Sequence, residues 1–130
     1  DMKFSLESNS DVNEIISYDD NHVVIRLRDN PDLLRLEDNL ILTPNQIVQN
    51  KTISNNIEHD ELQYLIALEP EVLILTKLSA KHIPPPILVK LSQHSIGVES
   101  MLLGAACRTY NLLAAEGRRV VLVLNFGFTA

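Results

Sequence analysis

Several kinds of residue are scarce in this 130-residue chain, and each scarcity argues against a class of protein. Tryptophan is absent and there is one cysteine, so no disulfide can form within the chain. The cysteine count leaves the compartment open, with a reducing cytoplasm as the expected localisation. Lysine and arginine number 11 against 17 acidic residues, which gives a net charge of -6. A nucleic-acid partner is therefore not expected, because phosphate binding requires a basic face.

Long apolar runs and catalytic motifs are missing as well. No run is long enough to span a bilayer and no signal-peptide pattern is present, so membrane insertion is not expected. The four histidines are scattered without metal-ligand spacing, and we expect neither a metal nor a cofactor. No Ser-His-Asp order, Walker loop or dinucleotide fingerprint occurs, so a catalytic role is less expected than a non-catalytic one.

One stretch organises the chain that remains. Residues Ala105–Glu116 favour a helix, with Ala106, Tyr110, Leu113 and Ala114 in a stripe at helical spacing. Gly117 suits the left-handed position after a helix end. The next five apolar residues, Val120–Leu124, predict a strand that is buried on both faces, as strands of parallel sheets are.

The first third of the chain predicts β-structure. Ile15–Tyr18 and Val23–Leu27 flank the turn formers Asp19-Asp20-Asn21 and predict a hairpin. Leu40–Thr43 predicts a short strand ended by Pro44, which cannot donate to a ladder. We expect Gln46–Asn56 to be irregular, with Ile47, Val48 and Ile53 as apolar anchors.

The second half alternates helices and strands. The pattern predicts a helix over Glu58–Leu68, with Leu62, Leu65 and Ile66 buried, and a strand over Val72–Leu75. A loop over Thr76–Ile83 precedes a second helix opened by Pro84-Pro85-Pro86, whose apolar face holds Ile87, Leu88 and Leu91. Gly97 is expected in the turn before a strand at Val98–Met101. This alternation indicates a mostly parallel sheet covered by helices, with the β-rich first third as a separate hairpin layer or as antiparallel edges.

Specific segments of the second half resemble a known family. These are Pro84-Pro85-Pro86, Ile96-Gly97-Val98-Glu99 and the stretch from Ala105 to Arg119 that contains Cys107-Arg108-Thr109-Tyr110-Asn111. They resemble a family of small proteins of unknown function that includes the adipogenesis-associated Mth-domain proteins and a mitochondrial respiratory complex I assembly factor. The resemblance covers roughly residues 15–124. It implies a three-layer α/β fold with a mixed, mostly parallel central sheet and an added N-terminal β-hairpin layer. The length indicates a single domain over residues 1–130, and the polar residues 1–12 are expected to be frayed.

The loop after the predicted strand Val72–Leu75 departs from the family pattern. The family usually has a Gly-Thr-Gly loop at this point, whereas this chain has Thr76-Lys77-Leu78-Ser79. A glycine-rich loop lets backbone N–H groups approach a ligand closely. If relatives hold a ligand there, this chain has lost or changed that ability.

Four residues form the candidate ligand- or partner-binding site: Lys77, Ser79, Cys107 and Arg108. Parallel strands would bring the loop with Lys77 and Ser79 to the start of the helix that carries Cys107 and Arg108. Cys107 is either a nucleophile in a helical first turn or, more simply, a small core residue. Arg108 either binds an anionic ligand or partner, or forms an ion pair with Glu99 or Glu116.

Two functions follow as hypotheses. The leading one is a non-catalytic protein-binding or assembly-factor-like module with an unknown protein partner. The alternative is an anionic small-ligand binding protein or an enzyme that uses the crevice near Arg108. A homodimer is also possible, because Phe126 and Phe128 near the end of the chain need cover, either from their own domain or from a second copy.

Overall fold

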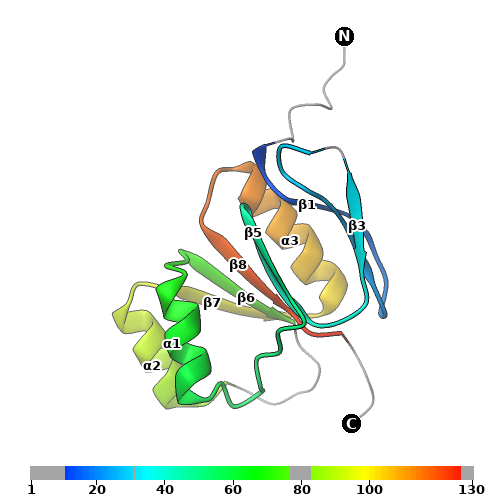
Figure 1. The fold of residues 1–130 in the computed structure, drawn as a ribbon. Helices are drawn as coiled ribbons and strands as arrows, with labels where there is room; N and C mark the ends of the chain where they lie inside the picture. The colour runs from blue at the N-terminus through cyan, green and yellow to red at the C-terminus, as the bar shows by residue number, and fades with distance from the viewer. Residues whose placement is uncertain (1–10, 31, 77–82, 127–130) are drawn as a thin grey trace.

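A computed structural model describes residues 11–30, 32–76 and 83–126, and it shows a mixed α/β fold (Figure 1). The elements in order are β1 (Glu14–Tyr18), β2 (Val23–Arg26), β3 (Leu33–Leu36), β4 (Leu40–Thr43), β5 (Gln46–Gln49), α1 (His59–Ala67), β6 (Val72–Thr76), α2 (Pro85–Gln93), β7 (Gly97–Met101), α3 (Leu103–Ala115) and β8 (Val120–Leu124). The strands form a three-stranded sheet in the order β1-β2-β3 and a five-stranded sheet in the order β5-β4-β8-β6-β7.

The predicted helix-strand unit is confirmed as the centre of the fold. Every residue of β8 is buried, and β8 pairs with β6 in parallel and with β4 in antiparallel fashion. Helix α3 ends in the turn around Gly117, whose φ of +79° is the left-handed conformation that favours glycine. The prediction of parallel pairs is confirmed as well, because β6 also pairs in parallel with β7.

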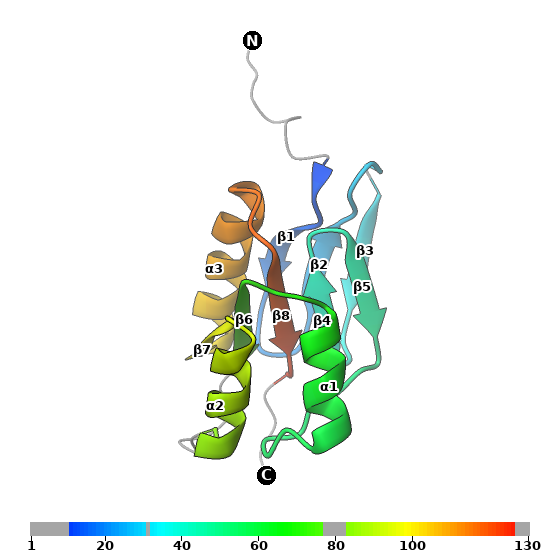
Figure 2. The same cartoon turned by 90° about the vertical axis from the view of Figure 1, so that its left-hand side faces the viewer.

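The alternating side chains of β8 divide the core between the two faces of the five-stranded sheet. Leu122 and Leu124 pack with the buried residues of α3 and with the inner face of the three-stranded sheet. Val121 and Val123 point the other way, toward Leu62 and Leu65 of α1 and the neighbouring α2. Figure 2 shows α1 and α2 beside the sheet on one face, and α3 with the small sheet beyond it. Helix α3 and the three-stranded sheet thus cover one face of the five-stranded sheet, and α1 and α2 cover the other.

Hydrogen bonds from α3 hold the three-stranded sheet in place. The side-chain amide of Asn111 pairs with the backbone of Ile15, accepting from its N–H at 2.9 Å and donating to its carbonyl at 2.8 Å. The hydroxyl of the buried Tyr110 donates to the carbonyl of Asn13 at 2.7 Å. Strand β1 is therefore docked edge-on against α3, which places the end of the strand, Tyr18, beside the first turns of that helix.

Two predictions about the first half need correction. The segment Gln46–Asn56 is not irregular throughout, because Gln46–Gln49 forms β5 and pairs with β4. Its polar ends are accommodated because β5 is an edge strand whose first and last residues are exposed. The strand β3 had no prediction at all; it pairs with β2, and its leucines are exposed (Leu33) or only partly buried (Leu34 and Leu36). The first third was predicted to form either a separate layer or antiparallel edges of the main sheet. It does both, because β1, β2 and β3 form their own sheet, whereas β4 and β5 add antiparallel strands to the five-stranded sheet.

Three predictions about the second half are also wrong in detail. Leu88 is 42% exposed and does not belong to the buried face of α2, which rests on Leu91. Gly97 is the first residue of β7, not part of a turn, because its N–H donates to Glu71 at 2.9 Å and joins the ladder with β6. Helix α3 begins at Leu103, two residues before the predicted start, and so includes Gly104.

Of the two phenylalanines near the chain end, Phe126 and Phe128, the structure describes the first. Phe126 is 7% exposed and packs in the cluster with Leu122, so it takes cover from its own domain. Phe128 lies outside the described residues. Phe126 therefore gives no support to a homodimer, which stays a prediction.

Strand β7 forms one edge of the five-stranded sheet. The N–H of Gly97 points to β6, so along the strand Gly97, Glu99 and Met101 direct their backbone groups to β6. The backbone groups of Val98 and Ser100 point outward. Within the described part of the chain, no strand pairs with this outer side. Figure 2 shows α2 and α3 flanking the edge.

Candidate functional site

The candidate site lies at the carboxyl ends of β6 and β7. Thr76 and Met101, the last residues of these strands, lie in register. Both strands therefore have their carboxyl ends on the same side of the sheet, as predicted. Leu102 is the N-cap residue of α3, which starts directly after β7. Lys77 and Ser79 lie outside the described residues. The structure thus places two of the four predicted site residues, Cys107 and Arg108, both on α3.

Cys107 faces the core. It is 0% exposed and packs in the cluster of α3, β8 and the small sheet. Burial raises the pKa of its thiol to about 12, and the nearby Arg108 opposes this only in part. A thiol with this pKa is protonated at neutral pH, whereas catalytic cysteines are thiolates. The geometry therefore favours the core interpretation of Cys107 over the nucleophile.

Arg108 lies one position further along α3 and points to the surface. Its Nη1 donates to the hydroxyl oxygen of Tyr18 at 2.6 Å. No ion pair with Glu99 or Glu116 occurs among the described residues, so neither of the two predicted partners is used. Gly104 leaves room for the contact, because an added Cβ would lie 3.2 Å from Nη1 of Arg108 and 3.3 Å from the Tyr18 ring and would require both side chains to shift slightly.

Two exposed leucines accompany Arg108 on α3. Leu102 is 69% exposed and Leu112 is 59% exposed, although both are large and apolar. Together with Ala105 and Thr109 they follow the spacing i, i+3, i+7, i+10, which places the four residues on one side of a helix. Arg108 precedes Leu112 by four residues, so it borders this side. We call the five residues Leu102, Ala105, Arg108, Thr109 and Leu112 the outer face of α3.

Sequence reasoning missed most of this face. Tyr18 lies 90 residues away from Arg108 in the chain, and no local pattern connects them. The exposure of Leu112 could have been predicted from the sequence, because this residue is apolar but lies outside the stripe of Ala106, Tyr110 and Ala114 that packs on the sheet. The spacing of Leu102 to Leu112 could have identified a second apolar side of the same helix.

Residues 11–30, 32–76 and 83–126, which the structure describes, contain neither a metal-binding cluster nor a membrane-spanning helix. Within these ranges, no three histidine, cysteine, aspartate or glutamate side chains converge closely enough to hold a metal ion. None of the helices in the same ranges combines the length and the apolar character needed to cross a bilayer.

Comparison with known families gives one match over most of the chain. A family described as "Protein of unknown function (DUF498/DUF598)" matches residues 15–125. A curated protein of Francisella tularensis subsp. holarctica, called "13 kDa major membrane protein", is 27% identical over 89 residues, which cover 65% of this chain and 72% of that protein.

Solved structures share the fold at a similar level of identity. An NMR structure from Xanthomonas campestris is 27% identical, covers 97% of this chain and 93% of its own, and has a TM-score of 0.70. A crystal structure from Bordetella parapertussis is 30% identical over 88% of this chain and 95% of its own, with a TM-score of 0.67. A solution structure from Bordetella pertussis, described as "a Mth938-like domain", is 25% identical over 98% and 95%, with a TM-score of 0.69.

Proposed function

We propose a function for this chain, which belongs to the DUF498/DUF598 family of proteins of unknown function. It is a non-catalytic, assembly-factor-like module that binds a protein partner. The observation that carries this proposal is the exposure of Leu102 and Leu112 on the outer face of α3. The family resemblance seen in the sequence, which includes an assembly factor of respiratory complex I, supports the same role. The buried, protonated Cys107 offers no nucleophile, which also favours binding over catalysis.

The outer face of α3 has the composition of a protein-binding surface. Apolar side chains that stay exposed in a folded domain, and that cluster beside polar ones, mark interaction sites. Leu102 and Leu112 supply apolar area, and Ala105 between them is small enough for a partner element to approach the helix closely. Arg108 donates to a neutral phenol, so an acidic group of the partner could form a stronger, charge-assisted hydrogen bond with it.

The experiment identifies a partner and then tests the surface. Affinity capture from the native cell followed by mass spectrometry names a candidate, and binding is then measured with both proteins purified. We expect Leu112→Ser and Arg108→Glu each to weaken that binding about tenfold or more, since buried apolar and arginine contacts dominate interfaces. Leu33→Ser is the matched control, because Leu33 is 57% exposed on β3 and belongs to the other sheet.

Thermal melts show whether each variant folds. If Leu112→Ser and Arg108→Glu both melt like the wild type and bind the purified partner with unchanged affinity, the outer face of α3 is not the interface. Equal losses for Leu33→Ser would point to a general effect of exposed leucines and would also contradict the proposal.

A small anionic ligand at the predicted crevice is the second candidate. It is favoured by Arg108, whose guanidinium is exposed at the carboxyl ends of β6 and β7. Lys77 and Ser79 remain its proposed neighbours, whereas Cys107 faces the core and cannot contact a ligand there. Titration with acetate and with inorganic phosphate, followed through the NMR amide signals of Ser79 and Arg108, tests this site. If neither signal shifts, the crevice does not bind such anions.

Cytoplasmic localisation and homodimer formation stay predictions. Light scattering at high protein concentration measures the second directly. A monomeric mass would contradict self-association, and a dimeric mass that Leu112→Ser reduces to a monomer would place the contact on the outer face of α3.

A further inference from the structure

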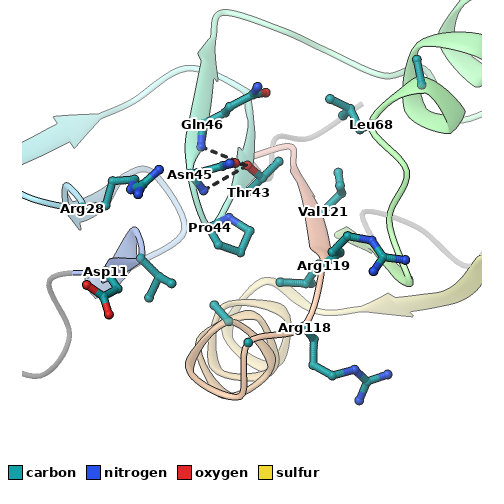
Figure 3. A pocket seen from close by; sticks show the side chains of 15 residues that line it. Asp11, Arg28, Thr43, Pro44, Asn45, Gln46, Leu68, Arg118, Arg119 and Val121 are labelled. Atoms are coloured by element: carbon teal, nitrogen blue, oxygen red, sulfur yellow. Dashed lines mark hydrogen bonds between the residues drawn. The ribbon is translucent and has the colours of Figure 1, made fainter.

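A concave site lined by described residues lies at the C-terminal end of α3, away from the half of the helix that carries Arg108. It has a volume of about 500 Å³ and lies between the turn that joins β4 to β5, the end of α1 and the segment that joins α3 to β8 (Figure 3). Sites of about 300–1,000 Å³ are typical of small-molecule binding. We call it the β4–α3 pocket.

The pocket exists because β4 and β8 separate at this end. Their ladder runs from Leu40↔Leu124 to Leu42↔Leu122 and does not continue to Val121. Pro44 follows β4 and has no N–H to donate, so it cannot extend the pairing. The backbone carbonyls of Thr43 and Pro44 are bonded to Asn13 instead. The side chain of Asn13 donates to the carbonyl of Thr43 at 3.0 Å, and its backbone N–H donates to the carbonyl of Pro44 at 2.8 Å. The gap is therefore held open by fixed hydrogen bonds.

The walls of the pocket combine apolar and polar side chains in similar numbers. The apolar side chains come from five parts of the chain and include Val12, Pro44, Leu68, Ala114 and Val121. Val121 and Ala114 are each 2% exposed, so these two walls belong to the rigid core. Apolar walls of this kind favour a ligand with an apolar body.

Charge at the rim is supplied mainly by arginines. The lining contains Arg28, Arg118 and Arg119 and a single acid, Asp11. Figure 3 shows Arg28 directed toward the β4–β5 turn, whereas the side chains of Arg118 and Arg119 run away from Pro44. Those two arginines pair with Glu71, at 3.1 and 3.9 Å. Arg28 is thus the cation that can serve a ligand in the pocket.

Arg28 is held in position, and among the described residues its guanidinium pairs with Asp29 alone. Its backbone N–H donates to Oδ1 of Asn13 at 2.9 Å, so the residue that fixes the β4 turn also fixes Arg28. Its Nη2 lies 3.3 Å from Asp29, and its side chain is 43% exposed. A guanidinium carries five N–H donors, and the described residues use few of those of Arg28, which leaves the others for a carboxylate.

We infer that the β4–α3 pocket binds a small organic carboxylate with an apolar body. The carboxylate lies against Arg28, and the apolar body lies on Pro44, Leu68 and Val121. This site is separate from the outer face of α3, so it stands or falls independently of the proposed protein partner.

Hexanoate is a suitable probe, with hexanamide as its neutral analogue of equal length. We expect hexanoate, titrated at pH 7 into the ¹⁵N-labelled protein, to shift the amide signals of Gln46 and Val121 in a saturable way. Arg28→Gln should weaken this binding about tenfold, since it removes a charge-assisted hydrogen bond. Arg35→Gln is the matched control, because Arg35 lies on β3, pairs with Glu37 and does not line the pocket.

A second variant tests the pocket without changing charge. Ala67 lines the pocket and is exposed, so Ala67→Phe adds a ring there with little effect on the fold, and it should abolish binding. The inference is overturned if hexanoate gives no saturable shifts, or if Arg28→Gln and Ala67→Phe both bind it like the wild type. Equal binding of hexanamide would overturn the assignment of an anionic ligand.

Discussion

Replacing Tyr110 by phenylalanine isolates one hydrogen bond in the centre of the fold. Tyr110 is 0% exposed, and its hydroxyl donates to the carbonyl of Asn13 at 2.7 Å. The substitution keeps the ring and leaves that carbonyl without its donor. A buried polar group that loses its partner costs about 1–3 kcal/mol. With an unfolding entropy of about 2.1 cal/mol/K per residue, a chain of this length should lose roughly 4–11 °C in Tm.

Alkaline pH provides a second signature of the same residue. Burial, and to a lesser degree the charge of Glu14, raises the pKa of Tyr110. The folded state therefore holds this proton at pH values where the unfolded state releases it. The stability that the protonated phenol contributes is complete below the ordinary pKa of 10.0 and is lost as pH rises above it. Tyr110→Phe should lose stability less steeply than the wild type above pH 10.0.

Thermal melts by circular dichroism between pH 7 and 11 make both measurements. Tyr64→Phe is the matched control, because its ring lies under the ammonium of Lys51 at 4.6 Å and this contact needs no hydroxyl. We expect the control to change stability by about 0.5 kcal/mol or less. If Tyr110→Phe melts within about 2 °C of the wild type, or if the control loses as much, the bond to Asn13 does not stabilise the domain.

Three further substitutions or treatments test other parts of the structure. Leu122→Ala should cost about 2–5 kcal/mol in urea unfolding, since Leu122 is 0% exposed between two strands; a change below about 1 kcal/mol would contradict the central position of β8. Burial raises the pKa of Glu61, but hydrogen bonds from Ser54 and Glu58 outweigh burial and lower the pKa below its ordinary value of 4.5. The ionised carboxylate therefore stabilises the fold above pH 4.5, and this stabilisation is lost as pH falls further. Glu61→Gln should therefore flatten the acid limb of the stability curve, and an unchanged limb would contradict this linkage. Cys107 should not react with a thiol-specific disulfide reagent at pH 8 until the protein is unfolded, because it is buried with a pKa of about 12; rapid native labelling would refute this.

The sequence predicted those elements whose cause is local. Helix α3 and strand β8 differ in the period of their apolar residues, and Gly117 marks the boundary between them. The parallel sheet followed from the alternation of helices and strands. Strands β3 and β5 were missed because edge strands are only half buried, so their patterns resemble those of loops. Their conformation depends on pairing with β2 and β4, which no short window contains.

The candidate site was predicted less completely. The position of Arg108 near the carboxyl ends of two parallel strands follows from topology and could be inferred. Its partner could not, because Tyr18 reaches it only after β1 docks on α3 through Asn111. The β4–α3 pocket also escaped prediction, since it arises where two strands that are distant in sequence diverge.

The open edge at β7 has a consequence for how the protein behaves when it is crowded. Two copies that joined these edges in antiparallel fashion through Val98 and Ser100 would place Glu99 of one copy opposite Glu99 of the other. Like charges directly opposite each other on paired strands repel, and charged residues on edge strands block aggregation in this way. Glu99 is exposed, and among the described residues it forms no ion pair. The sheet is thereby protected from growing by addition of identical molecules, while a foreign strand with a lysine at that position would meet no such barrier.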